Sequence, residues 1–330
     1  MLTYLKSLSS SARDYFKKYP FLGLDLGLNE IRLLQLEKRG SCFHIEKMVA
    51  HPFSVEKASR GKGSSWEAYR EPLLDLVAQM ELKNCSVALA LPHSAIIKKQ
   101  IELPPPLQES ELTAVLQQGL SQYFPGIPEN EIYFDYEVKP ANEAWLSILL
   151  VATRKQQLQS QLSVVEQAGL KVAIVDVDIY ALTRAAALFF YPNQERRNEI
   201  AVLLNLVSPV CSFIAFNAEE LIFHHSWNVD KAIFDNPLDH GDNWVQQVKN
   251  GWQLYQSNHP QRKITFMGVA GEIVHLDQLV SVFQKQFSLT VKQVNPFQAM
   301  THSASLRPNL INDYASRFLL CCGLARRGVK

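Results

Sequence analysis

The sequence lacks several features that would define a protein's class at once. It has no long hydrophobic run, because apolar stretches such as LSILLVA reach only strand length, far below the ~20 residues of a membrane-spanning helix. A net charge of +1 gives no reason to expect nucleic acid as a partner. Signal-peptide, GxSxG, HExxH and GxxxxGK[ST] patterns are also missing, so secreted, hydrolase, zinc-protease and P-loop classes have no support.

Cysteine is scarce, and its spacing follows no pattern. The five cysteines show no arrangement typical of a disulfide framework, and adjacent Cys321 and Cys322 are poorly placed to bridge one another. Hydrophobic residues make up 47% of the 330 residues and charged residues 20%, which favours large cores over disorder. We therefore expect a cytoplasmic protein with two domains of ordinary size and buried thiols.

The N-terminal segment, 1–19, has an amphipathic pattern. Its apolar residues recur at roughly helical spacing, and its basic residues lie mostly elsewhere: Lys6, Arg13, Lys17 and Lys18. This pattern predicts a short helix that packs on its own domain, or a partly ordered tail. Peripheral contact with an anionic membrane is the alternative, although four basic residues are few for lipid binding.

What the sequence does contain is an internal repeat. DLGLNEIRLLQL begins at Asp25, and a similar pattern, NLVSPVCSFIAF, begins at Asn205. Both are followed by a polar turn and a further strand-like run, CFHIE or IFHHS. The repeat predicts equivalent hairpins at 22–36 and 202–216, one opening each half of a duplicated fold.

Strands and helices alternate between and after these hairpins. Strands are predicted at 86–92 and 171–178, and helices at 155–168 and 313–326. A further helix carries an apolar stripe that is more typical of a core than of a binding surface: Trp244, Val248, Trp252 and Tyr255. The alternation predicts the α/β class.

Several longer runs resemble the PilM family, the actin-like proteins of type IV pilus assembly. They include QYFPGIPENEIYFDYEV, VATRKQQLQSQLSVVEQAGLKVAIVDVDIYALTRA, FMGVAGEIVHLDQLVSVFQKQFSLTVKQVNPF and CCGLARR. The matches occur in the family's order and extend from about residue 20 to the end. The resemblance implies a two-lobed actin-like ATPase fold, built by a ribonuclease H-like duplication. The helical insert of the second lobe is expected to be reduced, because 227–242 leaves little room for it.

The resemblance also implies a division of the chain. After the N-terminal segment come a first lobe at 20–197 with an inserted subdomain at about 86–153, a second lobe at 198–310, and a C-terminal helix at 311–330 that returns to the first lobe. Family members hold a nucleotide between hairpins that contact its phosphates, so ATP and Mg²⁺ are the implied cofactors. Asp25 would lie near the metal, Gly27 near the phosphate, and Arg32 at the family's basic position. Alternatively, Asp25 and Gly27 only shape a β-turn.

This sequence departs from that nucleotide-binding pattern. Leu28, Asn29 and Glu30 replace a hydroxyl-rich turn. In the second hairpin, Asn205 removes a metal-binding charge, Val207 replaces a glycine, and Pro209 removes an N–H donor. The run from Gly268 to Gly271 is predicted to be the adenosine-side turn, although strand-to-helix connections use similar turns.

Asp178 has two interpretations. Its position resembles that of an acidic residue that orients water in a hydrolysing relative. The other interpretation, which we favour, is the N-cap of the following helix.

Two functions remain open at this stage. One, which the resemblance implies, is a cytoplasmic scaffold at the inner face of the inner membrane, which binds the N-terminal tail of a PilN-like membrane protein and other pilus assembly components without ATP hydrolysis. The resemblance places its groove in the first lobe, beside the inserted subdomain. The other is a nucleotide-binding actin-like ATPase or sugar kinase with an unusual site. The altered second hairpin favours the scaffold, with a weak nucleotide site at Asp25, Gly27, Arg32, Gly268 and Gly271 and no metal or cofactor expected.

Overall fold

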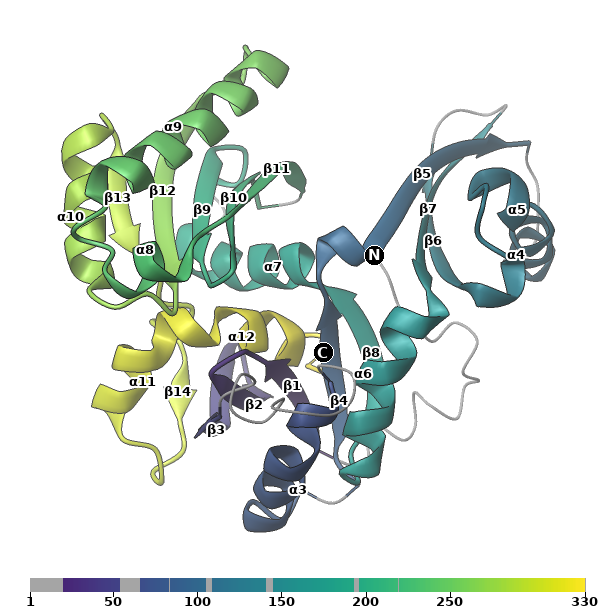
Figure 1. Cartoon of the computed structure of the whole chain (residues 1–330), viewed down its shortest axis with the longest axis horizontal. Coiled ribbons are helices and arrows are strands. Elements are labelled where there is room, and N and C mark those ends of the chain that lie inside the picture. Colours follow the sequence, from purple (N-terminus) through teal and green to yellow (C-terminus); the bar gives the residue numbers. More distant parts are fainter. Residues whose placement is uncertain are drawn as a thin grey trace. The chain divides into compact units, whose positions relative to one another are not determined.

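The computed structural model describes residues 20–53, 66–82, 84–104, 109–140, 145–192, 196–218 and 220–329. Strands and helices alternate along these ranges, as the sequence predicts (Figure 1). The chain forms two compact units: a first unit made mainly of His51–Asp178, and a second made of Leu22–Leu28, Arg32–Ala50 and the chain from Ile179 onward. These limits differ from those of the predicted lobes, because most of the first hairpin belongs to the second unit. The predicted N-terminal helix lies outside the described residues.

In the second unit, both predicted hairpins are present. β1 (Phe21–Leu26), β2 (Glu30–Arg39) and β3 (Cys42–Pro52) are neighbours in one sheet, with the short β14 (Thr301–His302) beside β3. β9 (Ile200–Leu206), β10 (Val210–Phe216) and β11 (Leu221–Asn228) are antiparallel neighbours in another. The repeated sequence pattern therefore corresponds to a repeated strand arrangement.

The second sheet continues with two parallel strands and has the order β11-β10-β9-β12-β13. β12 (Ile264–Gly271) pairs with β9 and with β13 (Thr290–Gln293). Two helices, α9 (Gly241–Asn258) and α10 (Leu276–Gln286), bury Trp244, Tyr255 and Phe283 against it. The predicted apolar stripe of α9 is thus core. The expected reduction of the helical insert is also observed, since α8 (Lys231–Asp235) is the only helix between β11 and α9.

The C-terminus contains successive helical segments in place of the single predicted helix. α11 (Pro308–Tyr314) and the 3₁₀ turn η5 (Ala315–Phe318) precede α12 (Leu319–Ala325). A Cβ at Gly323 would lie 1.8 Å from the carbonyl oxygen of Ala181, so α12 crosses α7 (Asp178–Phe190) at backbone contact. Gly23 of β1 has the same role, because its Cβ would lie 2.2 Å from the Cys321 carbonyl oxygen. Glycine is needed for both contacts.

The first unit contains a parallel pair of strands, β4 (Ser86–Leu91) and β8 (Lys171–Val177). Two of its helices are α3 (Arg70–Gln79) and α6 (Lys155–Gln167). Short 3₁₀ turns occur at η1 (Glu67–Tyr69), η2 (His93–Ala95) and η3 (Glu129–Glu131). The predicted insert began at residue 86, but Ser86–Leu91 pairs with β8.

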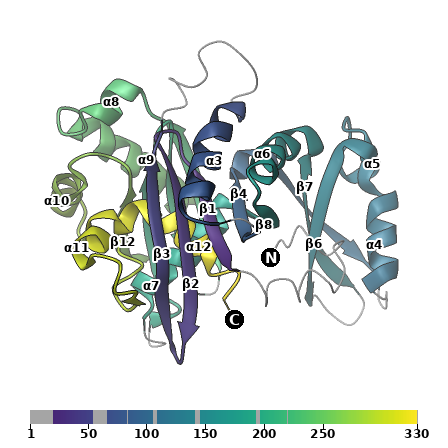
Figure 2. The ribbon, with the colours of Figure 1, turned by 90° about the horizontal axis from the view of Figure 1, so that it is seen from below.

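Between β4 and α6 the chain forms a separate antiparallel sheet, β5-β7-β6. Its strands are β5 (Ile96–Leu103), β7 (Leu146–Arg154) and β6 (Ile132–Pro140). α4 (Glu109–Gln118) and α5 (Leu120–Tyr123) cover one face and form a small core with Ile148 and Leu150 (Figure 2). No helix of the insert's described residues covers the opposite face.

Candidate functional site

The first hairpin contains the predicted phosphate-binding residues, but its basic residue is buried. Asp25 lies near the end of β1, Gly27 follows in the turn, and Leu28 at the tip is 41% exposed. Arg32 on β2 is only 1% exposed. Its guanidinium forms ion pairs with Asp25 at 2.8 Å and with Glu272 at 2.5 Å. The basic residue therefore binds two carboxylates of the same chain.

Arg32 remains charged in this environment. Burial lowers its pKa, but the charges of Asp25 and Glu272 more than offset that effect, so the pKa lies above its ordinary value. Both carboxylates are largely buried, with 14% and 12% of their side chains exposed. The group is thus a buried ion triad, in which removal of one member leaves another charge uncompensated.

Glu272 was not identified from the sequence. It follows the last residue of β12, and its backbone N–H donates to the Leu206 carbonyl at 3.0 Å, which fixes it beside the second hairpin. The available signal was an acidic residue directly after a glycine at a strand end. That signal is weak, because its meaning depends on Arg32, which is distant in sequence.

The predicted adenosine-side turn is wrong, since Gly268 to Gly271 are the last residues of β12. Gly268 is a packing residue: a Cβ there would lie 2.4 Å from the Phe190 ring and 2.5 Å from Val294. Gly271 has φ +139°, and its Cβ would lie 2.0 Å from the Leu206 carbonyl oxygen. Both glycines are explained by close packing, and neither by itself indicates a nucleotide.

The second hairpin offers little to a magnesium-bound triphosphate. Asn205 lies on β9 opposite Ser212 and Ala270, and Val207 and Pro209 form the turn to β10. The neutral amide of Asn205 supplies no metal-binding charge. Val207 has a branched side chain, and Pro209 has no backbone N–H to donate to a phosphate. Within the described residues, no three His, Cys, Asp or Glu side chains gather as a metal site would require. These residues do not fit the nucleotide that the fold family implies.

Asp178, for which the N-cap interpretation is favoured, lies at the start of the following helix. Asp178 is the first residue of α7, and its Oδ1 accepts a hydrogen bond from the N–H of His93 at 2.9 Å. This hydrogen bond therefore links the segment after β4 to the start of α7, directly after β8.

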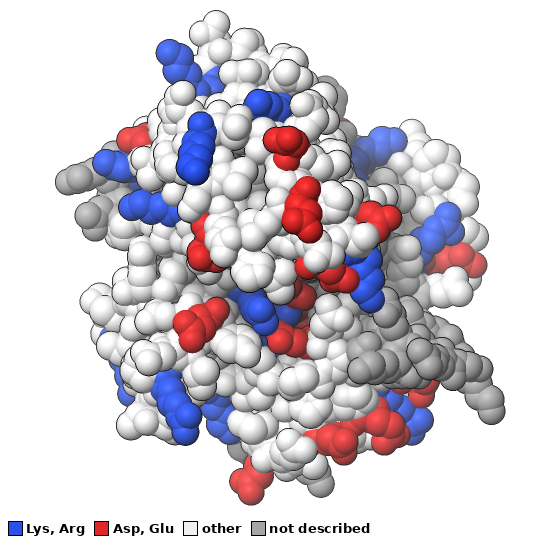
Figure 3. All heavy atoms as spheres, turned by 60° about the vertical axis from the view of Figure 1, so that its left-hand side comes forward, with Lys and Arg blue, Asp and Glu red and all other residues white. Residues whose placement is uncertain are grey.

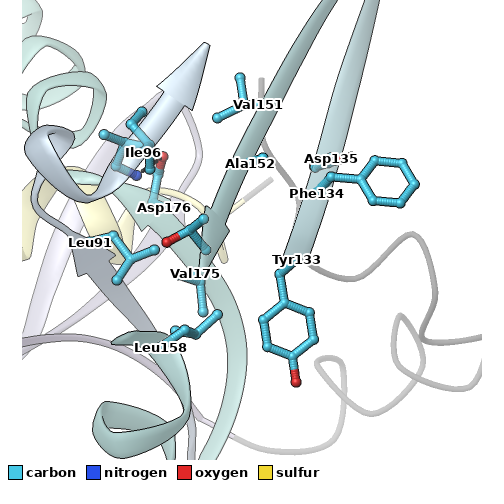
Figure 4. A pocket seen from close by; sticks show the side chains of 12 residues that line it. Leu91, Ile96, Tyr133, Phe134, Asp135, Val151, Ala152, Leu158, Val175 and Asp176 are labelled. Carbon is cyan, nitrogen blue, oxygen red and sulfur yellow. Dashed lines mark hydrogen bonds between the residues drawn. The ribbon is translucent and has the colours of Figure 1, made fainter. Parts of the chain in front are cut away.

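A different kind of site lies in the first unit, where the insert sheet faces β8. It is a small groove of about 40 Å³. Figure 4 shows Leu91, Leu158, Val175 and Asp176 on one side and Tyr133 and Asp135 on the strand opposite. The full lining is mostly apolar: Leu91, Ile96, Tyr133, Phe134, Asp135, Val151, Ala152, Thr153, Leu158, Val175, Asp176 and Val177.

Two of the strands beside this groove are edge strands of their sheets. In the described residues, β6 ends the insert sheet and β8 ends the sheet that contains β4. Each carries a buried aspartate whose Oδ1 accepts the N–H of the next residue: Tyr136 for Asp135 at 2.9 Å, and Val177 for Asp176 at 2.8 Å. Each carboxylate therefore accepts a backbone N–H of its own strand.

A second, larger cavity of about 500 Å³ lies in the second unit. It is bounded by the end of α7, by β12 and by the edge strand β13. Arg196 stacks on Phe266 at its rim, 5.0 Å from the ring centroid, and lies 4.0 Å from Glu199. At the outer edge of β13, Gln284 accepts the Val291 N–H and donates to the Leu289 carbonyl, so it occupies positions that another strand would use.

The face of the molecule drawn in Figure 3 carries no continuous patch of basic side chains. On the face drawn in Figure 3, Lys and Arg are interspersed with Asp and Glu among a larger uncharged area. This agrees with the net charge of +1. None of the helices in the described ranges has the length and apolar character required to cross a bilayer.

Together, the repeated hairpins, the parallel strands that follow them and the inserted sheet define an actin-like ATPase fold. The chain is similar to a structure described as the PilM-PilN type IV pilus biogenesis complex, with 18% identity, a TM-score of 0.69 and coverage of 94% of this chain and 99% of that one. The family model for type IV pilus assembly protein PilM matches residues 23–229 and 238–329. The chain therefore belongs to the PilM family.

More distant similarities were found to other proteins. The cytoplasmic domain of EpsL, an inner membrane component of the type II secretion system of Vibrio cholerae, has 14% identity and a TM-score of 0.41, with 91% of this chain and 96% of that chain covered. MreB 5 of Spiroplasma citri, bound to AMPPNP, has 11% identity and a TM-score of 0.45, with coverage of 92% and 94%.

Proposed function

We propose that this PilM-family chain is a scaffold that captures the N-terminal tail of a PilN-like membrane protein in the first-unit groove. The observation that carries the proposal is the groove itself, which runs between two edge strands and has a mostly apolar lining. Extended peptides bind such places by backbone pairing, while pockets receive alternate side chains. No catalytic group is needed for this function.

The comparisons support the identity of the partner. The similar structure, at 18% identity, is that of a PilM–PilN complex. Because PilN-like proteins are expected to be anchored in the inner membrane, capture of the tail would hold the scaffold at the cytoplasmic face of that membrane. Other pilus assembly components would then be recruited to the same place. Peripheral membrane contact through residues 1–19 is a further part of the proposal.

Filling the groove should abolish capture of the tail. Ile96 is half-buried and lines the groove, and its neighbour Ile97 is 44% exposed and does not. Ile96→Trp is expected to weaken binding of a PilN-like tail peptide at least tenfold, because the indole would occupy the space of a peptide side chain. Isothermal titration calorimetry with the full chain measures this.

The matched control is Ile97→Trp, which adds the same bulk one residue away. We expect its affinity to equal that of the wild-type chain. Equal weakening by both substitutions, or by neither, would contradict the placement of the tail in this groove.

We further propose that the chain does not hydrolyse ATP and binds nucleotide weakly or not at all. Arg32 is engaged with Asp25 and Glu272, and the second hairpin lacks a metal-binding charge. Each lost charge-assisted contact costs about 1.5–3 kcal/mol, so several together lower affinity by orders of magnitude. The alternative, an ATPase or kinase, relies on the retained Asp25, Gly27 and Arg32.

Calorimetry with ATP and Mg²⁺ distinguishes these alternatives. We expect no site of micromolar or tighter affinity. Such a site, if it disappeared in Asp25→Ala, would establish the nucleotide-binding alternative. The double substitution Asn205→Asp with Val207→Gly is expected to raise nucleotide affinity, if it changes it at all.

A further inference from the structure

The larger cavity, in the second unit, combines positive charge with aromatic surface. Its volume of about 500 Å³ is typical of ligand-binding clefts. Arg196 and Lys292 belong to its described lining, which contains no Asp or Glu. The same lining includes three phenylalanines, Phe189, Phe190 and Phe266. A ligand that fits this lining carries a negative charge beside an apolar group.

The position of Lys292 in β13 directs its side chain to this cavity. Val291 belongs to the core with α9 and α10, so its neighbours Thr290 and Lys292 point to the other face of the sheet. Lys292 lies opposite Gly268 of β12 and is exposed. It forms no ion pair with the described residues. Its ammonium is therefore available to an anion.

Arg196 is held in place although it is exposed. Its guanidinium stacks on the Phe266 ring, 5.0 Å from the centroid, and its backbone carbonyl accepts the Glu199 N–H at 3.0 Å. The Tyr191 hydroxyl donates to the Glu199 carbonyl at 2.8 Å, which fixes the same turn. A guanidinium positioned in this way loses less entropy when it binds a carboxylate.

Glu199 neutralises Arg196 only in part. Its Oε1 lies 4.0 Å from Nε of Arg196, beyond hydrogen-bond distance. The Arg196 side chain is 59% exposed and that of Glu199 is 38% exposed, so solvent weakens the pair. The two terminal amino groups of Arg196 form no hydrogen bond with the described residues. They remain available for a bidentate contact with a carboxylate.

The number and position of these cations limit the kind of partner. Two are too few for nucleic acid or an anionic membrane, which larger basic clusters recognise. Both are exposed, whereas small-molecule sites enclose most of their ligand. Gln284 occupies the Val291 N–H and the Leu289 carbonyl at the outer edge of β13, so a strand cannot pair there. These features favour a protein segment that is bound through its side chains.

We infer that this cavity binds a segment of a second protein in which an aspartate or glutamate lies next to an aromatic residue. The carboxylate would contact Arg196 and Lys292, and the ring would pack on Phe189 and Phe190. The inference goes beyond the proposed function, because the cavity lies in the second unit and the groove for the tail lies in the first. Each unit would then have a binding site of its own.

The test varies charge on both partners. The probe is a hexapeptide of alternating Glu and Phe with both ends capped, and two matched peptides replace every Glu by Gln or every Phe by Ala. Saturation-transfer NMR measures the Kd of each with the full-length chain. Arg196→Gln and Lys292→Gln each remove a cation from the cavity. The control Arg197→Gln makes the same charge change at an exposed neighbour outside the lining.

The wild-type chain and Arg197→Gln should bind the Glu-Phe peptide roughly tenfold or more tightly than the peptide with Gln, a ratio typical of charge-assisted contacts. The peptide with Ala should also bind more weakly. Arg196→Gln and Lys292→Gln should each weaken binding of the Glu-Phe peptide by roughly threefold or more. All three substitutions are at exposed positions, so the variants should fold like the wild type.

Three results would overturn the inference. The first is that the wild-type chain does not bind the Glu-Phe peptide, or binds all three peptides equally. The second is that Arg196→Gln and Arg197→Gln have equal effects, since the peptide would then bind elsewhere. The third is Arg196-dependent binding of phosphatidylglycerol vesicles without binding of the peptide, which would assign the cavity to a membrane surface. None of these results changes the proposal for the tail groove.

Discussion

Replacing Arg32 by Met is expected to lower the free energy of unfolding by about 3–5 kcal/mol. The substitution keeps much of the side chain's volume and removes its charge. Asp25 and Glu272 would then be two largely buried carboxylates that have lost their shared cation. Because such charges are costly in a poorly solvated site, the loss should appear as a lower midpoint in urea denaturation with an unchanged slope.

Arg39 provides a matched control on the same strand. Its guanidinium contacts Glu37 and Glu46, but its side chain is 54% exposed. Solvent screens these pairs, so Arg39→Met should change the free energy of unfolding by less than about 1 kcal/mol. Similar small effects of both substitutions would show that the Arg32 triad does not stabilise the second unit.

The second large effect is expected at Gly271. Gly271→Ala should lower the free energy of unfolding by at least about 2 kcal/mol, because φ of +139° is unfavourable for alanine and the added Cβ would meet the Leu206 backbone at 2.0 Å. The strand end must shift, and Glu272 moves with it. Circular dichroism during thermal unfolding measures the loss.

Gly241→Ala is the corresponding control. Gly241 begins α9, and no heavy atom lies within 4 Å of an added Cβ. The change should therefore be within about 0.5 kcal/mol or slightly stabilising. A Gly271→Ala variant as stable as this control would contradict the packing role assigned to Gly271.

The sequence was informative where local pattern and structure coincide. The repeat from Asp25 and Asn205 predicts both hairpins, because apolar alternation and polar turns determine strands locally. The helical spacing of Trp244, Val248 and Tyr255 likewise predicts the buried face of α9. These features need no knowledge of distant residues.

The site was less predictable because it depends on contacts between distant segments. Nothing near Arg32 in sequence indicates that Glu272 is its second partner. Gly268 resembles a turn residue, yet glycine is needed there because a Cβ would collide with the Phe190 ring. The groove combines residues from β4 through β8, so its lining could be located only in general terms.

The most direct test of the central claim is hydrogen exchange of the nucleotide-free chain, with and without the PilN-like tail peptide. Our account predicts slower exchange in the segments that contain β6 (Ile132–Pro140) and β8 (Lys171–Val177), with β9 to β13 unchanged. Protection that appears only after ATP and Mg²⁺ are added, or that is confined to β9 to β13, would contradict it.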